Sequence, residues 1–320
     1  MKLIASLCFV LAFLFHFSCK KENVPEPIPD PGPPAVKPPD TLGLGWKKIP
    51  FIGSPQKLND IFFVGNTGFC ISANTIYKTT NAGVNWTESY IGVSDIYNIG
   101  MGSDTNAIFV GSRELIVTHN GGINFEFLNL PDSFVTDVFF VSTSTAYLGG
   151  KSIWKTTNGG DSWTKLHEFV TADGYKSLYF INDQTGWVIR KNGLFKTTNG
   201  GINWNLINTG STLFNATSVF FTDTSHGLIS DNMSVTSTKN GGSSWTKIYE
   251  GTPGFHDIHF ISSDTGYITD KTYILKTIDG GISWNKEVVL PWDTFVELHF
   301  TDANHGWACS MNGTILKYEK

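Results

Sequence analysis

Apolar and polar residues alternate with a period of two in seven short segments, which recur roughly 40 residues apart. The segments cover residues 60–64, 98–102, 137–141, 177–181, 218–222, 257–261 and 297–301. In each, the second and fourth residues are apolar, as Ile61 and Phe63 are in the first. Such alternation is typical of a β-strand with one buried face. A second apolar run follows after a turn, for example 68–71, and a third follows that, for example 76–79.

Six near-identical octapeptides come directly after the third run of the first six repeats. They begin at Thr79 (TTNAGVNW), Thr118 (THNGGINF), Thr156 (TTNGGDSW), Thr197 (TTNGGINW), Thr238 (TKNGGSSW) and Thr277 (TIDGGISW). A period near 40 with strand patterning indicates four-stranded units, none of which can bury its faces alone. Radial stacking of these units gives a β-propeller.

The seventh repeat lacks its octapeptide and its fourth strand, because the chain ends shortly after 315–318. Residues 46–49 (WKKI) read like 163–166 (WTKL) and 245–248 (WTKI), which begin fourth strands. We therefore predict an all-β fold, a seven-bladed β-propeller of four-stranded blades over residues 41–320. Its N-terminal strand completes the last blade and closes the ring, which protects the strand edges.

The octapeptide pattern Thr-x-Asn/Asp-x-Gly-x-x-Trp resembles the Asp-box, or BNR-like, repeat. Its Asn or Asp accepts local backbone N–H groups, its Gly supplies a positive φ, and its Trp holds the turn against the blade. We expect a structural role for Asn81, Asn120, Asn158, Asn199, Asn240 and Asp279.

Together with Gly-Trp motifs at 185–187 and 305–307, the boxes make residues 46–320 similar to the photosystem II stability/assembly-factor-like propellers. That resemblance implies a seven-bladed, non-enzymatic scaffold for protein binding or assembly.

Asp-boxes also occur in sialidases and in two-propeller xyloglucanases. Sialidase activity implies three arginines that grip a carboxylate, and this chain has only Arg113 and Arg190. The sequence contains no nucleophile elbow, phosphate loop, HExxH or CxxC motif, so we expect no catalytic residue and no cofactor. His259 and His299, each two residues after an acid, could bind a metal, but we expect none. A glycan-binding or glycan-active (glycoside hydrolase-like) surface propeller is the alternative function.

The N-terminus resembles a bacterial lipoprotein signal. Lys2 precedes an apolar run from Leu3 to Phe15, and Ser18-Cys19 follows. We expect a signal peptide at 1–18 and a palmitate-bearing lipid on Cys19. The proline-rich residues 19–40 then form an extended stalk. Lys20 and Lys21 favour an outer-membrane lipoprotein with a periplasmic or surface-exposed head; an ordinary secretory signal is the alternative.

One face of the predicted ring is a candidate binding surface. It carries the loops between strands two and three and the loops that join consecutive blades. These loops hold the basic residues Arg113, Lys151, Arg190 and Lys191 and the aromatic residues Tyr175, Phe255 and Trp292. Aromatic and arginine side chains are enriched in protein interfaces. We expect an envelope protein or a surface polymer as partner of a monomeric head. Ordinary solvated charge and aromatics that staple strand ends are the alternatives. The net charge of −5 disfavours nucleic acid.

Cys70 and Cys309 lie on second strands of repeats one and seven, which are neighbours in a closed ring. They could form a disulfide, or they could be two buried thiols.

Overall fold

The computed structural model describes residues 41–51, 57–92, 95–132, 134–169, 175–191, 193–207, 216–251 and 255–320. These residues belong to the second of two units into which the chain divides, Lys37–Lys320. The predicted signal peptide, lipidation site and stalk lie outside the described residues. Across the described ranges every regular element is a strand, and none of them contains a helix long and apolar enough to span a bilayer.

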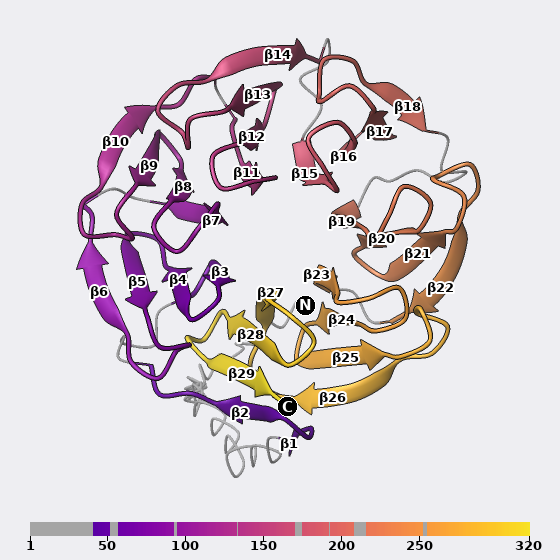
Figure 1. Ribbon diagram of the computed structural model, residues 1–320. Helices are drawn as coiled ribbons and strands as arrows, with labels where there is room; N and C mark the ends of the chain where they lie inside the picture. Colours follow the sequence, from indigo (N-terminus) through magenta and orange to yellow (C-terminus); the bar gives the residue numbers. More distant parts are fainter. Residues whose placement is uncertain are drawn as a thin grey trace, which may run out of the picture. The chain divides into compact units, whose positions relative to one another are not determined.

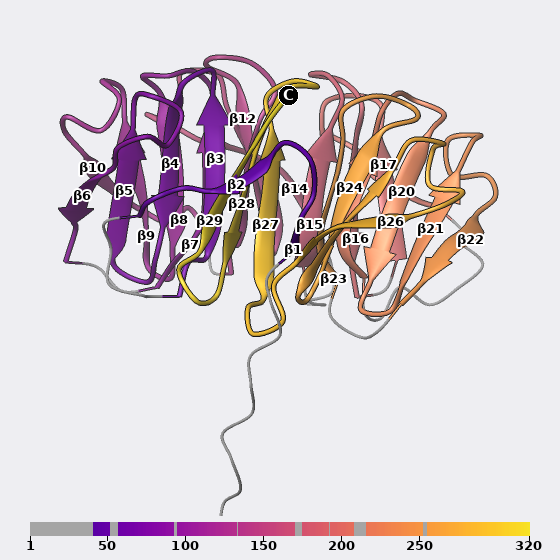
Figure 2. The ribbon, with the colours of Figure 1, turned by 90° about the horizontal axis from the view of Figure 1, so that it is seen from below.

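Seven antiparallel sheets follow one another around a ring, as Figure 1 shows in a view down the ring axis and Figure 2 from the side. Blade 1 comprises β3 (Asp60–Val64), β4 (Thr67–Ile71), β5 (Thr75–Thr79) and β6 (Thr87–Tyr90). Blade 2 comprises β7 (Ile96–Met101), β8 (Ala107–Gly111), β9 (Glu114–Thr118) and β10 (Glu126–Asn129). Blade 3 comprises β11 (Asp137–Phe140), β12 (Ala146–Gly149), β13 (Ser152–Thr156) and β14 (Thr164–Glu168).

Blade 4 comprises β15 (Tyr175–Phe180), β16 (Gly186–Arg190), β17 (Gly193–Thr197) and β18 (Asn205–Ile207). Blade 5 comprises β19 (Ala216–Phe221), β20 (Gly227–Asp231), β21 (Ser234–Thr238) and β22 (Thr246–Glu250). Blade 6 comprises β23 (Phe255–Phe260), β24 (Gly266–Asp270), β25 (Tyr273–Thr277) and β26 (Asn285–Val289). Blade 7 comprises β27 (Phe295–Phe300), β28 (His305–Ser310), β29 (Ile315–Glu319) and β2 (Trp46–Lys48). The predicted fold class, seven four-stranded blades, is confirmed.

The N-terminal strand closes the ring. β2 pairs antiparallel with β29, and Trp46 lies opposite Tyr318. The indole of Trp46 is buried, with its ring centroid 6.0 Å from that of Phe300 in the same blade and 6.1 Å from that of Tyr267 in blade 6. A short strand that the sequence pattern did not reveal, β1 (Thr41–Leu42), adds a fifth strand to blade 6 by pairing with β26.

Stacked aromatic rings join neighbouring blades. Phe221 of β19 stacks on Trp187 of β16 with centroids 3.6 Å apart, and Phe63 of β3 stacks on Trp307 of β28 at 3.7 Å. In blade 1 the second strand, β4, has Gly68 near its start, beside the ring of Phe63. A Cβ on Gly68 would overlap that ring, so a residue without a side chain is needed there. The Gly-Trp motifs therefore set how closely two blades approach, which fixes the positions of the inner strands around the axis.

Candidate binding face and central channel

The octapeptides form the same hydrogen-bonded turn six times, each between the third and fourth strands of a blade. In blade 4, the Thr197 hydroxyl donates to Asn199 Oδ1 (3.0 Å) and accepts the Gly201 N–H (2.9 Å). Asn199 Oδ1 also accepts the Asn203 N–H at 3.0 Å. The carboxylate at the equivalent position, Asp279, has its pKa lowered to about 2 by hydrogen bonds from Ser283. These side-chain oxygens are occupied by their own turns, which is a structural role.

Arg190 does not lie on the surface, so its predicted place among the basic residues of the candidate binding surface is wrong. It ends β16, and only 1% of the residue is exposed. Its guanidinium donates to the Gly150 carbonyl (2.8 Å) and lies 4.1 Å from the centre of the Phe169 ring. Tyr175 lies opposite Arg190 in the β15–β16 pairing, and its hydroxyl donates to Asp137 Oδ2 at 2.7 Å. Arg190 and Tyr175 thus connect blade 4 to blade 3, so Tyr175 acts as a staple.

The other predicted basic residues remain on the candidate face. Arg113, between β8 and β9, and Lys191, after β16, are both exposed. Lys151 forms an ion pair with Glu168 (2.7 Å), which raises the pKa of the lysine and, with Lys165, lowers the pKa of the carboxyl to about 2. An exposed pair of this kind presents less net charge to a partner than the sequence suggested.

Two aromatic side chains project from loops that join blades. Trp292, between β26 and β27, is 57% exposed, and Phe134, between β10 and β11, is 75% exposed. The Trp292 backbone is fixed, because its carbonyl accepts a hydrogen bond from Asn312 Nδ2 at 2.6 Å. Phe255 begins β23, and its side chain lies outside the described part of the structure. We call the surface formed by Arg113, Phe134, Lys191 and Trp292 the inter-blade face.

A ring of polar side chains lines the central channel at the start of the inner strands. Asp60 Oδ2 accepts the backbone N–H of Ile99 in the next blade at 2.7 Å. The equivalent side-chain oxygen accepts a backbone N–H of the following blade in three more places. Asn98 accepts from Val138 (2.9 Å), Asp137 from Leu178 (3.0 Å) and Asp257 from Leu298 (3.2 Å). The position is held by Ser177, Ser218 and Glu297 in the remaining blades. These contacts fasten adjacent inner strands and bring four carboxyl groups around one axis.

Burial makes these carboxyl groups weaker acids than they are in water. Desolvation raises the pKa of Asp60 to about 8, and it also raises the pKa values of Asp137 and Asp257. Desolvation and the neighbouring Asp257 raise the pKa of Glu297 well above its ordinary value. In the described ranges, none of the four forms an ion pair with a lysine or arginine.

Two residues further along each inner strand, a row of rings lines the channel. The rings are Phe62, Phe139, Tyr179, Phe220, His259 and His299. Consecutive centroids are 5.1 Å (Phe139–Tyr179), 4.8 Å (Tyr179–Phe220), 5.5 Å (Phe220–His259), 5.7 Å (His259–His299) and 4.0 Å (His299–Phe62) apart. Blade 2 contributes Gly100 instead, beside Val138. Burial lowers the pKa of His259 to about 4 and that of His299 to about 3, so both imidazoles are neutral at pH 7.

The polar ring and the aromatic row enclose a cavity of about 540 Å³. Its lining starts at Thr136, Lys176 and Thr217, near the inter-blade ends of the inner strands, and reaches the aromatic row. Within the described residues, no group of three or more His, Cys, Asp and Glu side chains is arranged to hold a metal ion. The His-and-acid pairs of β23 and β27, His259 with Asp257 and His299 with Glu297, line the wall of this cavity.

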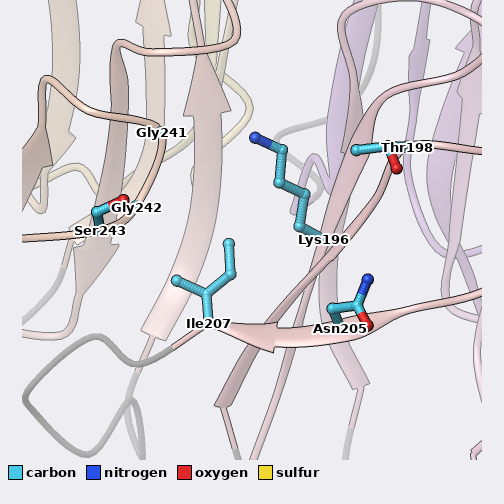
Figure 3. A pocket seen from close by; sticks show the side chains of 7 residues that line it. All are labelled: Lys196, Thr198, Asn205, Ile207, Gly241, Gly242 and Ser243. Carbon is cyan, nitrogen blue, oxygen red and sulfur yellow. The ribbon is translucent and has the colours of Figure 1, made fainter.

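A smaller hollow of about 290 Å³ lies between blades 4 and 5 at the octapeptide turn of blade 5 (Figure 3). Its lining consists of Lys196, Thr198, Asn205, Ile207, Gly241, Gly242 and Ser243. Lys196 lies over the Trp187 ring, 5.1 Å from its centre, and burial lowers its pKa. Lys155 and Lys276 make the same contact with Tyr147 and Tyr267 in blades 3 and 6. The lysine–aromatic contact beside this hollow is therefore a repeated structural feature of the blades.

Cys70 and Cys309 are both free, fully buried thiols in one cluster at the junction of blades 1 and 7. Burial, and next to it the neighbouring Cys70 thiol, raise the pKa of the Cys309 thiol well above its ordinary value. The alternative of two buried thiols describes this structure, and the disulfide stays a prediction for an oxidising compartment.

The chain matches no family model and no curated relative. Its fold is similar to that of YCF48 bound to a D1 peptide, with a TM-score of 0.73 and 17% identity over 88% of this chain and 99% of that one. Virginiamycin B lyase from Staphylococcus aureus has a TM-score of 0.72 and 12% identity, over 86% and 99% of the two chains. The GH74 enzyme of Niastella koreensis has a TM-score of 0.66 and 13% identity, over 86% of this chain and 53% of that one. At these identities the likeness shows the fold alone.

Sequence reasoning placed only His259 and His299 and the acids before them at the channel, and it did not identify the full ring of polar residues, although a signal for that ring was present. A polar residue precedes the apolar pair in every inner strand: Asp60, Asn98, Asp137, Ser177, Ser218, Asp257 and Glu297. Only the closed ring shows that these seven positions meet at one axis.

Proposed function

We propose that this protein is a non-enzymatic, lipid-anchored propeller that binds a partner protein of a bacterial envelope through the inter-blade face. The observation that carries the proposal is the exposure of Trp292. All ten tryptophans lie in described residues, and the other nine are buried or half-buried. An exposed indole on a fixed backbone is a favourable anchor for a protein interface, because it supplies a large contact area at a small cost in conformational entropy.

The surroundings of Trp292 support a protein partner. Phe134 and Arg113 are exposed on the same inter-blade face, and aromatic residues and arginine are the side chains most enriched in interfaces. The fold is also similar to that of YCF48, which has been solved with a peptide bound.

The test compares Trp292→Ala with Ile123→Ala. Ile123 is 77% exposed in an octapeptide turn, on the opposite face, so its substitution removes a similar apolar surface. Partners are cross-linked in the native envelope, identified by mass spectrometry, purified and titrated against each variant. We expect Trp292→Ala to weaken binding at least about 30-fold, the loss of a ~2 kcal/mol anchor. Equal affinities of the two variants for the purified partner would contradict the proposed face.

The lipid anchor rests on Ser18-Cys19 and on the proline-rich residues that follow. Two or more acyl chains hold a protein stably in a membrane, whereas one does so marginally. Cys19→Ala is therefore expected to move the protein from the outer-membrane fraction to the soluble fraction, and unchanged fractionation would rule the anchor out.

A glycan-active propeller is the second candidate, favoured by the similarity to a GH74 enzyme. This chain spans about half the length of that enzyme. Release of reducing sugar from xyloglucan by the purified protein would support this candidate over the binding module.

A further inference from the structure

The channel cavity is polar along part of its wall and aromatic along the rest. Its lining runs from Thr136, Lys176 and Thr217 to the aromatic row and includes Phe260, one residue beyond that row. Lys176 is exposed, which places the mouth of the cavity at the inter-blade ends of the strands. A volume of about 540 Å³ is in the range of small-ligand sites.

The wall carries carboxyl groups without cationic partners. Asp60, Asp137, Asp257 and Glu297 come from four different blades, and their hydrogen bonds in the described structure involve backbone N–H groups, hydroxyls, the Asn98 side chain and one another. A group with positive charge that entered the cavity would meet carboxyl groups on several sides.

The aromatic row is an independent feature that also suits a cation. Five consecutive ring contacts, from Phe139 to Phe62, form a nearly continuous aromatic band on the channel wall, two residues further along the inner strands than the carboxyl groups. Aromatic faces attract ammonium and guanidinium groups, and cages of such rings recognise organic cations. His259 is neutral, lines the cavity, and makes ring contacts but no hydrogen bond among the described residues. Its ring nitrogen is therefore available to a ligand.

We propose that the channel is a binding site for an organic cation, an alkylammonium or guanidinium group held by the carboxyl ring and the aromatic row. A metal ion fits less well, because the described acidic and imidazole groups are not arranged as a coordination shell. The cation could belong to a free amine or to a basic side chain of a protein. The inference does not depend on the proposed partner face.

Binding is coupled to proton release. Asp60 and Glu297 are largely protonated when the cavity holds no cation, since burial raises the pKa of Asp60 to about 8 and that of Glu297 well above its ordinary value. A bound cation stabilises the ionised form and expels a proton. With one proton released, affinity rises about tenfold per pH unit below a pKa of about 8. The titratable or charged groups that face these carboxyls are Tyr175, Lys176, Tyr179, His259, His299, Cys70 and Cys309.

The experiment is calorimetric titration of the full chain with n-butylammonium and with n-butylguanidinium, each at pH 6 and pH 8, and with neutral n-butanol as control. We expect saturable one-to-one binding of at least one cation, tighter by up to about 50-fold at pH 8 than at pH 6, and no binding of butanol. A blocked tripeptide with a central lysine distinguishes the sources: tighter binding than butylammonium indicates a protein side chain, and weaker binding indicates a free amine.

The variant Asp60→Asn combined with Glu297→Gln is expected to weaken binding at least tenfold. Asp60→Asn keeps the acceptor for the Ile99 N–H, and Asn98 already fills the same role in blade 2. Glu126→Gln, at an exposed carboxyl of β10, is the matched control. Absence of cation binding at pH 8, equal heats for butanol and butylammonium, or full affinity in the folded double variant would each overturn the proposal.

Discussion

Asp60→Asn is expected to stabilise the propeller increasingly as the pH rises from 7 to 9. Asp60 is 5% exposed, and burial raises its pKa from 3.8 to about 8. An acid whose pKa is raised in the folded state stabilises the fold only while it is protonated. That stability is present below the unfolded pKa and is lost progressively as the pH rises towards the folded pKa.

The magnitude follows from the pKa of Asp60. Between pH 7 and pH 9 the folded group passes from roughly nine-tenths to roughly one-tenth protonated, while the unfolded group stays ionised. The average excess of half a proton over two pH units lowers the free energy of unfolding by about 1.4 kcal/mol. His259 and His299 contribute little here, because they are neutral in the fold and mostly neutral in the unfolded chain at these pH values.

The assay is urea unfolding followed by tryptophan fluorescence at both pH values. Asparagine cannot ionise, so the advantage of Asp60→Asn over the wild type should grow by at least about 1 kcal/mol from pH 7 to pH 9. The other buried acids and the cysteines are present in both proteins, so most of their effect cancels in the difference. Asp104→Asn, at an exposed position, is the control and should show no such growth. An advantage that is constant or that shrinks over this range would refute the reasoning.

Three further predictions concern the turns and the closure of the ring. Ala82 occupies the left-handed position (φ 56°) that glycine holds in the other octapeptides, so Ala82→Gly should raise the free energy of unfolding by about 1 kcal/mol in urea titration. A decrease in that free energy would show that the contacts of the Ala82 methyl group outweigh the backbone strain. Asn199→Ala removes the acceptor for the Asn203 N–H and should destabilise by about 1–2 kcal/mol without weakening partner binding, which a titration of the purified partner checks. Deleting residues 41–50 removes β1 and β2 and leaves the outer edge of β29 unpaired, so it should lower the melting temperature far more than deleting residues 20–38; equal melting temperatures would argue against closure by this strand.

The strand pattern and the octapeptides were sufficient to predict the architecture. The inner strand of blade 1, expected at 60–64, is β3 (Asp60–Val64), and the strand expected at Trp46 is β2 (Trp46–Lys48), which pairs with blade 7. These features depend on local and periodic properties: alternation marks a strand, and each repeat requires a neighbour. The two-residue strand β1 was missed because two residues carry no periodic signal.

The candidate site was predicted less well, because exposure depends on contacts between blades. Arg113 and Trp292 lie on the surface as expected, whereas Arg190 is buried beneath Phe169 and bonded to Gly150. The position of an arginine at the end of a strand or in a loop does not indicate whether the arginine side chain points into solvent or packs on the adjacent blade.

The sequence by itself determined the number of blades, their strands, the turns at the rim and the strand that closes the ring, since each of these is encoded within one repeat or by comparison of repeats. Only the tertiary structure decided which polar residues meet. Asp60 and Glu297 are separated by most of the chain, yet closure of the ring brings them to one axis and removes them from water. Their shifted pKa values, and the cavity they line with the aromatic row, arise from that closure, because desolvation and charge proximity are properties of the assembled ring.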